Sequence, residues 1–177
     1  MLRSKTKMRH TSFDIKEPGL NILPPGVERY IVNGGGLTGI QILPDDEIEI
    51  INDEGNQVCE ISVFDKDGNS NLQILNLKEK KDTSEIVKIL SKKNESSLTA
   101  NYQLKKRNIK INKSKSAVLF NRDTVPGEKI KLNSKDKCYC IFSAPGPDMI
   151  IHEQNPNTDL TIFVRRAEIK KDKEHSI

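Results

Sequence analysis

The sequence has no tryptophan, and only 5% of its residues are aromatic. Proteins that bind single-stranded nucleic acid stack the bases on aromatic side chains, so a stacking platform is not expected here. Arginine is also scarce, because 22 of the 29 basic residues are lysine. Lysine lacks the planar fork with which arginine reads phosphates and bases. The net charge of +4 is mild, and a basic-surface interaction module is therefore only a minor hypothesis.

Long apolar runs are missing as well. No stretch approaches the ~18 apolar residues that a membrane helix needs, and the polar first residues show no signal peptide. Cysteine is limited to three residues, an odd number without a disulfide framework, which suits a reducing compartment. We expect a cytoplasmic protein without a membrane partner.

Charge is present in quantity, but it is unevenly spread. Residues 41–68 hold nine acidic residues and one lysine, whereas residues 78–137 hold seventeen basic and seven acidic residues. The length of 177 residues suits one domain. The expected organisation is a mobile N-terminal arm over 1–21, one β domain over 22–167 with a Lys-rich segment at 78–115, and a charged tail over 168–177.

Short strands with turn residues between them dominate the pattern. Alternating charged and apolar residues at 47–50 predict a half-buried strand, and Gly34-Gly35-Gly36 predicts a tight turn or a close approach of two backbones. The remaining predicted strands cover residues 27–32, 37–43, 57–64, 117–120, 129–132, 138–142 and 160–164. This spacing predicts a mainly β fold, either a small barrel or a two-sheet sandwich, with one short helix.

The short helix is expected in the middle of the chain. Residues 82–85 have the composition of a helix start, with a capping residue followed by an acidic one, and the apolar pattern continues to about Lys93. The polar segment that follows gives a weaker signal. We expect edge strands at 101–104 and 109–111, where lysines would discourage pairing with other chains.

Two cysteines lie two residues apart on a predicted strand. Cys138 and Cys140 must therefore face the same side. Together with Cys59 and His152 they could form a tetrahedral zinc site. The alternative is that the thiols are small apolar residues of the core, which is the more common role of a buried free cysteine.

The segment 142–167 is the most unusual part of the sequence. Its polar groups lie between a turn at 145–147 and a second turn at 155–158. A high density of polar side chains between two rigid turns is typical of the rim of a ligand site or of a docking surface. A well-capped crossover loop explains the same residues equally well. The candidate ligand-binding residues of this segment are Asp148, His152, Glu153 and Gln154.

The turn between the third and fourth predicted strands has a signature of its own, formed by Asp53, Gly55 and Gln57. Gln57 shares a strand face with Cys59 and Ile61, which predicts that both Gln57 and Cys59 are buried. A buried amide must find partners, either backbone groups of a turn or a ligand. Asp53 and Gln57 are therefore further candidates for ligand binding.

Two stretches of the sequence resemble a known family. Residues 30–65, with the turn formed by Asp53, Gly55 and Gln57, resemble the urea-carboxylase-associated domain. Residues 143–167 resemble the end of the N-terminal region of aminomethyltransferase-like proteins, which are relatives of the glycine-cleavage T-protein. The resemblance covers residues 24–64 and 117–167.

This resemblance implies two functions. The first is an accessory or binding domain of a one-carbon or amine-metabolising enzyme, whose partner is a T-protein-like chain or domain that uses tetrahydrofolate. The second is a deiminase or hydrolase of urea or carboxyguanidine-type nitrogen metabolism with a Cys/His metal site. The family's central His-Asp and Cys have no counterpart in residues 91–108, so the resemblance favours the non-catalytic domain.

Overall fold

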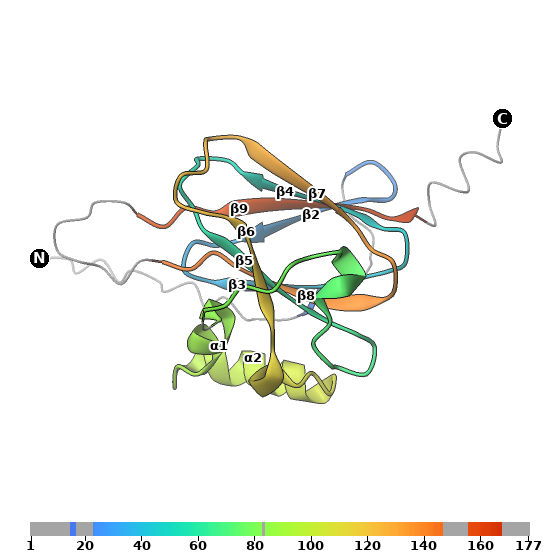
Figure 1. Ribbon diagram of the computed structural model, residues 1–177, viewed down its shortest axis with the longest axis vertical. Coiled ribbons are helices and arrows are strands. Elements are labelled where there is room, and N and C mark those ends of the chain that lie inside the picture. Colours follow the sequence, from blue (N-terminus) through green and yellow to red (C-terminus); the bar gives the residue numbers. More distant parts are fainter. Residues whose placement is uncertain (1–14, 17–22, 83, 147–155, 168–177) are drawn as a thin grey trace, which may run out of the picture.

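The computed structural model describes residues 15–16, 23–82, 84–146 and 156–167, and these form a sandwich of two β-sheets with helices on one side (Figure 1). The five-stranded sheet has the order β1-β3-β8-β5-β6, and the four-stranded sheet has the order β2-β9-β4-β7. The strands are β1 (Ile15–Lys16), β2 (Val27–Val32), β3 (Leu37–Ile42), β4 (Glu47–Asn52), β5 (Cys59–Phe64), β6 (Ser116–Phe120), β7 (Glu128–Asn133), β8 (Cys138–Ser143) and β9 (Leu160–Arg165).

The expectation of a mainly β fold is confirmed. Within the described residues neither sheet closes on itself, so the sandwich is the correct one of the two expected architectures. All strand pairs are antiparallel except β1 with β3, which are parallel. Two residues of the expected N-terminal arm, Ile15 and Lys16, form β1, and Ile15 is buried.

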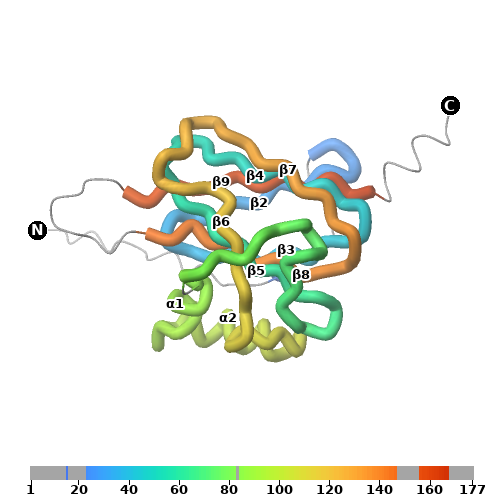
Figure 2. Tube along the Cα trace, viewed as in Figure 1, coloured from blue at the N-terminus to red at the C-terminus, as the bar shows by residue number. Residues whose placement is uncertain are grey.

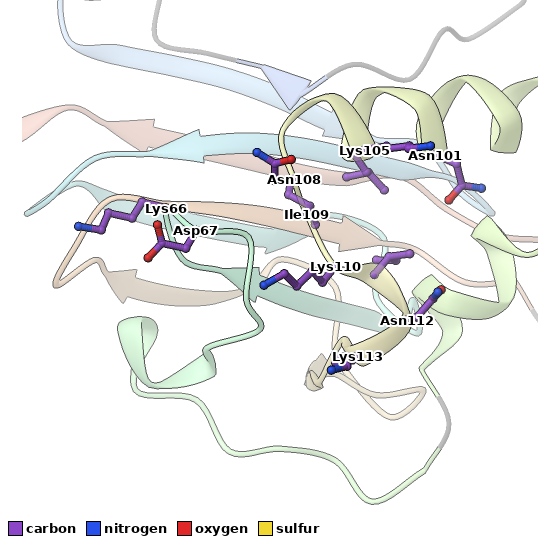
Figure 3. A pocket seen from close by; sticks show the side chains of 11 residues that line it. Lys66, Asp67, Asn101, Lys105, Asn108, Ile109, Lys110, Asn112 and Lys113 are labelled. Atoms are coloured by element: carbon purple, nitrogen blue, oxygen red, sulfur yellow. The ribbon is translucent and has the colours of Figure 1, made fainter.

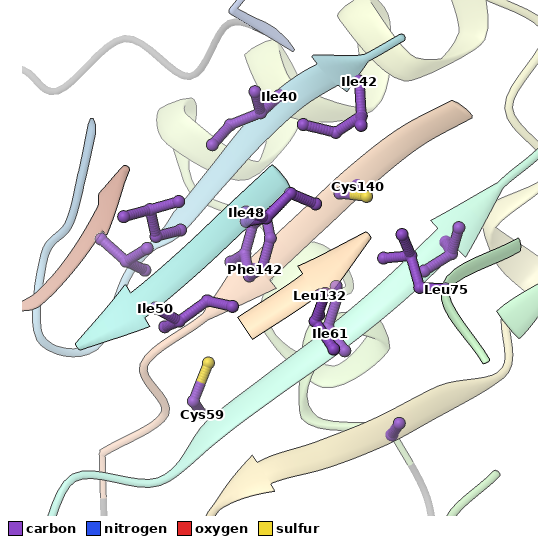
Figure 4. Close-up of a cluster of buried hydrophobic side chains, with 14 of the residues drawn as sticks. Ile40, Ile42, Ile48, Ile50, Cys59, Ile61, Leu75, Leu132, Cys140 and Phe142 are labelled. Atoms are coloured by element: carbon purple, nitrogen blue, oxygen red, sulfur yellow. The ribbon is translucent and has the colours of Figure 1, made fainter. Parts of the chain in front are cut away.

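The main core lies between the two sheets, where isoleucines of β3 and β4 meet side chains of β5 and β8 (Figure 4). β5 has no exposed residue, because both of its faces are covered. Cys59, Ile61 and Val63 belong to the core between the sheets, whereas Phe64 belongs to a second cluster under the helices. β5 is therefore buried on both sides, while β8 holds the middle position of the five-stranded sheet.

Two helices cover the outer face of the five-stranded sheet and form a third layer (Figures 1 and 2). The predicted short helix is α1 (Glu85–Leu90), and Ser84 is its N-cap, accepting a hydrogen bond from the backbone N–H of Val87. The predicted edge strands at 101–104 and 109–111 are wrong. The first lies in α2 (Glu95–Lys106), and the second leads into the 3-10 turn η2 (Ile111–Lys113). A further 3-10 turn, η1 (Leu72–Leu75), follows β5.

A buried ion cluster fixes the end of β9 to the start of β2. Arg166 donates from Nε to Glu28 at 3.0 Å and from Nη1 to Asp46 at 2.6 Å, and it also donates to the backbone oxygen of Gln41. Tyr30 donates its hydroxyl to the same Glu28 carboxylate. The three charged residues are at most 4% exposed. They are paired with one another, as buried charges must be.

In the described parts of the chain, no helix is both long enough and apolar enough to cross a membrane.

Candidate functional site

The candidate site is built around the turn between β4 and β5, and Gly55 gives this turn its shape. Its φ of +76° lies in the left-handed region, and an added Cβ would lie 2.7 Å from the backbone nitrogen of Pro126. The next residue, Asn56, donates its N–H to the oxygen of Thr124. Asp53 accepts a hydrogen bond of 2.7 Å from the hydroxyl of Thr161 on β9. The turn is therefore attached to two other parts of the sandwich.

Gln57 is the central polar residue of this region. It is 5% exposed, as its position on the inner strand face predicts. Its Nε2 donates to the backbone oxygens of Val58 and Pro145, both at 3.0 Å, and its Oε1 accepts from the N–H of Thr158 at 2.9 Å. All the hydrogen-bonding groups of this amide have backbone partners. One side chain thus holds Pro145 and Thr158 to the β4–β5 turn.

Two polar atoms beside Gln57 have no partner among the described residues, namely Asn52 Oδ1 and Thr158 Oγ1. Asn52 is fully buried, and its Nδ2 donates to the backbone oxygen of Gln57 at 2.8 Å. Leaving a buried polar atom unpaired costs on the order of 1–3 kcal/mol. We call Asn52, Gln57 and Thr158 the Gln57 cluster. Its two unpaired atoms are one amide oxygen, an acceptor, and one hydroxyl.

Glycines allow the neighbouring backbones to approach this end of the sandwich. A Cβ at Gly34 would lie 2.7 Å from the backbone oxygen of Asn157, and one at Gly146 would lie 2.1 Å from the side chain of Asn157. The N–H of Gly34 also donates to Asp159 at 2.9 Å. Both predicted features of the glycine-rich turn are seen: a close backbone approach at Gly34, and a tight turn in which the N–H of Gly36 donates to the Asn33 oxygen at 2.8 Å.

The other candidate ligand-binding residues, Asp148, His152, Glu153 and Gln154, lie outside the described residues. Gln57 hydrogen-bonds to Pro145 and to Thr158, and these two residues precede and follow the four candidates in the sequence. Of the predicted ligand-binding set, Asp53 and Gln57 are described, and both contribute hydrogen bonds that hold the turn.

The three cysteines do not come together. Cys138 and Cys140 face the same side of β8, as predicted, and their sulfurs are 3.8 Å apart in the core. Cys140 pairs with Val63 of β5, four residues from Cys59. A strand rises by about 3.3 Å per residue, so Val63 and Cys59 are about 13 Å apart along β5. Figure 4 shows Cys59 and Cys140 well separated in the core. His152 is not described, so the described residues provide only two neighbouring thiols and do not fit the four-ligand zinc set.

The thiols are also poorly suited to nucleophilic chemistry. All three cysteines are fully buried. Burial raises the pKa of Cys59 and the pKa of Cys140, whereas the contact with Cys140 lowers the pKa of Cys138. A reactive cysteine needs both a stabilised thiolate and access to its substrate. The alternative that the thiols are core residues fits their environment.

Fold and site together define a class: an antiparallel two-sheet β-sandwich with a buried polar cluster at one end. No model of a known protein family matches the chain. The chain is 30% identical over 156 residues to the trimethylamine-oxide aldolase of Ruegeria pomeroyi. The match covers 88% of this chain but only 20% of that protein. The chain therefore spans about a fifth of the length of the curated relative that it matches.

Asn52 and Thr158 are not among the site residues predicted from the sequence. Asn52 is the last residue of β4, and Thr158 lies two residues before β9. The available signal was weak: each is a polar residue at a strand end next to a predicted turn, where solvated side chains are the usual case. Both hydrogen-bond to Gln57, which is 101 residues from Thr158 in the sequence.

Proposed function

We propose that this chain is a non-catalytic ligand-binding domain of an amine-metabolising enzyme system, and that the Gln57 cluster takes a small methylated amine or amine oxide. The observation that carries the proposal is the pair of unpartnered polar atoms, Asn52 Oδ1 and Thr158 Oγ1, on two residues that both hydrogen-bond to Gln57. Buried polar atoms normally have partners.

The two atoms match the chemistry of such ligands. A protonated methylamine has an N–H that an amide oxygen such as Asn52 Oδ1 can accept, and an amine oxide has an oxygen to which the Thr158 hydroxyl can donate. The similarity to trimethylamine-oxide aldolase supports this ligand class. The three free cysteines suit a cytoplasmic location.

The catalytic step belongs to a partner in this proposal. The resemblance to the urea-carboxylase-associated domain suggests a T-protein-like chain or domain that uses tetrahydrofolate. The chain corresponds to a fifth of its relative, which supports an accessory role. The deiminase alternative has less support, because its thiols are buried in two separate places.

Calorimetric titration of the purified chain with trimethylamine oxide, trimethylamine and dimethylamine tests the ligand. Thr158→Val keeps the shape of the side chain and removes the hydroxyl. We expect it to weaken the binding of trimethylamine oxide about tenfold while leaving the stability equal or higher, because an unpaired buried hydroxyl is lost. Thr38→Val is the matched control, because it makes the same change of side chain outside the Gln57 cluster. The Thr38 hydroxyl donates to the backbone oxygen of Ile31 in an exposed hydrogen bond. No saturable binding, or equal affinity in Thr158→Val and the wild type, would contradict the proposal.

A second experiment tests the partner. A Ruegeria pomeroyi trimethylamine-oxide aldolase lacking the matched fifth is mixed with this chain and passed over a sizing column. Co-elution, lost when Gln57→Ala replaces the wild-type chain but kept with Gln73→Ala, is the expected result. Gln73 is an exposed residue of η1 and serves as the control. Separate elution in every mixture would contradict the proposed partner. It would not bear on the proposed ligand.

A further inference from the structure

A hollow lies on the outer layer of the molecule, separate from the Gln57 cluster. Its volume is about 900 Å³, which is within the range of small-molecule sites. Figure 3 shows that its walls come from the loop after β5, the last turns of α2 and the segment leading into η2. Residues from three separate parts of the chain therefore surround one space.

The charge of this hollow is strongly one-sided. Four lysines line it, Lys66, Lys105, Lys110 and Lys113, against a single carboxylate, Asp67. Within the described residues none of the four makes an ion pair, whereas Lys80, Lys115 and Lys131 elsewhere each face a carboxylate within 4.0 Å. Lys110 donates to the neutral amide oxygen of Asn69, which holds the ammonium group without cancelling its charge.

The other lining groups narrow the ligand class. Asn101, Asn108 and Asn112 add amide groups, and Leu104, Ile109 and Ile111 provide a small apolar surface. The lining has no aromatic side chain, so it lacks the stacking surface that nucleobases use. Lysine ammonium groups bind phosphates and carboxylates as point charges. This combination suits a compact anion better than a nucleic-acid strand.

Close packing and backbone hydrogen bonds hold the segments around the hollow together. Gly68 is packed so closely that a Cβ would lie 2.1 Å from the oxygen of Asn108, and Lys110 donates its N–H to the Gly68 oxygen at 2.9 Å. Asn108, directly after the C-cap of α2, has the left-handed conformation, with φ of 57°. These contacts set the position of Lys110 relative to the loop that holds Lys66. The lysines are therefore presented by a fixed backbone and not by a loose segment.

We propose that this hollow, the lysine groove, binds a small polyanion: a molecule with two or more phosphate or carboxylate groups. Clustered ammonium groups raise the local concentration of such anions and strengthen their binding, with a dependence on ionic strength because the groups are exposed. The groove shares no residue with the Gln57 cluster, so this site and the amine-ligand site can fail independently.

Amide NMR titrations of the full chain with tripolyphosphate and with citrate test the groove at low and at physiological salt. We expect saturable shifts confined to residues around 66–69 and 101–113, weaker at the higher salt. Lys105→Gln/Lys110→Gln should reduce the affinity at least about tenfold. Asp67→Asn should raise the affinity about twofold or more, because it removes the only carboxylate of the lining.

Lys92→Gln/Lys93→Gln is the matched control, because both residues are exposed and lie before α2, whose first residue is about 15 Å from Lys105 along the helix. It changes the net charge equally and should alter the affinity less than about twofold. Binding of only one probe would assign the groove to phosphates or to carboxylates. No saturable binding of either, or equal losses in the groove and control variants, would overturn the proposal.

Discussion

Two adjacent arginines near the end of β9 have opposite surroundings, and this difference gives a prediction at the scale of single residues. The Arg166 side chain is 4% exposed and paired with Glu28 and Asp46, whereas the Arg165 side chain is 32% exposed and paired with Glu47 and Glu49. Removing one partner of a buried pair leaves an uncompensated charge. Arg166→Met should therefore lower the free energy of unfolding by about 3–5 kcal/mol.

The neighbouring variant is the control for this prediction. Arg165→Met should cost less, about 1 kcal/mol, because Arg165 is partly exposed and Glu49 keeps Lys131 at 3.7 Å. Urea denaturation of both variants measures the difference. Similar losses in the two variants would mean that the buried cluster stabilises the fold no more than the partly exposed pairs of Arg165 do.

Glu60 gives a second prediction at this scale, one that depends on pH. Burial alone would raise its pKa, but hydrogen bonds from Lys80, Ser84, Ser116 and the Glu85 N–H outweigh burial and lower the pKa below 4.5. A lowered pKa in the folded state means that the carboxylate adds stability above the unfolded pKa and loses it as the pH falls through the folded value.

Glu60→Gln should therefore cost about 1–3 kcal/mol at pH 7, and this cost should shrink as the pH falls below about 4.5. Urea denaturation at pH 7, 5 and 3 measures the trend. Glu79→Gln provides the control, since Glu79 pairs with Lys115 on the surface, where both side chains are about half exposed. A cost for Glu60→Gln that stays constant with pH would contradict the assignment.

At the scale of elements, the strands were the predictable part. Alternating residues and turn signals placed β2 at its observed bounds and placed the other strands of residues 37–165 within about two residues of their observed ends. The start of α1 at Ser84 was also predictable, because a capping serine followed by an acidic residue is a signal between neighbouring residues. These features depend on residues close to one another in the sequence.

α2 was missed for a physical reason. Its larger side chains Leu98 and Tyr102 are 63% and 67% exposed, and its buried face consists of Ser97, Ala100 and Leu104. The helix therefore lacks the apolar stripe by which a sequence reveals an amphipathic helix. Thr158 and the Arg166 pairs were missed for a different reason, because the residues that bind them lie far away in the sequence: Gln57 is 101 residues from Thr158, and Glu28 is 138 residues from Arg166.

The junction between α2 and the loop after β5 depends on Gly68, and Gly127 offers a matched comparison. Both glycines have positive φ, +75° and +77°, but only Gly68 has neighbours where a Cβ would lie. Gly127→Ala should cost about 1–2 kcal/mol from backbone strain alone. Gly68→Ala adds a clash with the Asn108 backbone and should cost clearly more. Equal thermal stabilities of the two variants would contradict this prediction, because they would show that the backbone at Asn108 moves aside for the added Cβ without loss of stability.

At the scale of the whole molecule, an open sandwich must prevent its sheet edges from pairing with other chains. β7 is the last strand of its sheet in the described structure and pairs only with β4. Its exposed residues include Lys129 and Lys131, and the latter lies 3.7 Å from Glu49 on β4. Charged side chains, lysine above all, are a common protection of such edges.

Removing these charges should therefore change the association of the whole chain. Lys129→Val/Lys131→Val leaves a β-branched edge strand with an unpaired backbone, so we expect concentration-dependent oligomers or aggregates in light scattering. Lys92→Val/Lys93→Val adds the same apolar surface outside any sheet edge and should stay as dispersed as the wild type. If both variants associate equally, exposed apolar area and not edge pairing is the cause, because only the first variant alters a strand that can accept a partner.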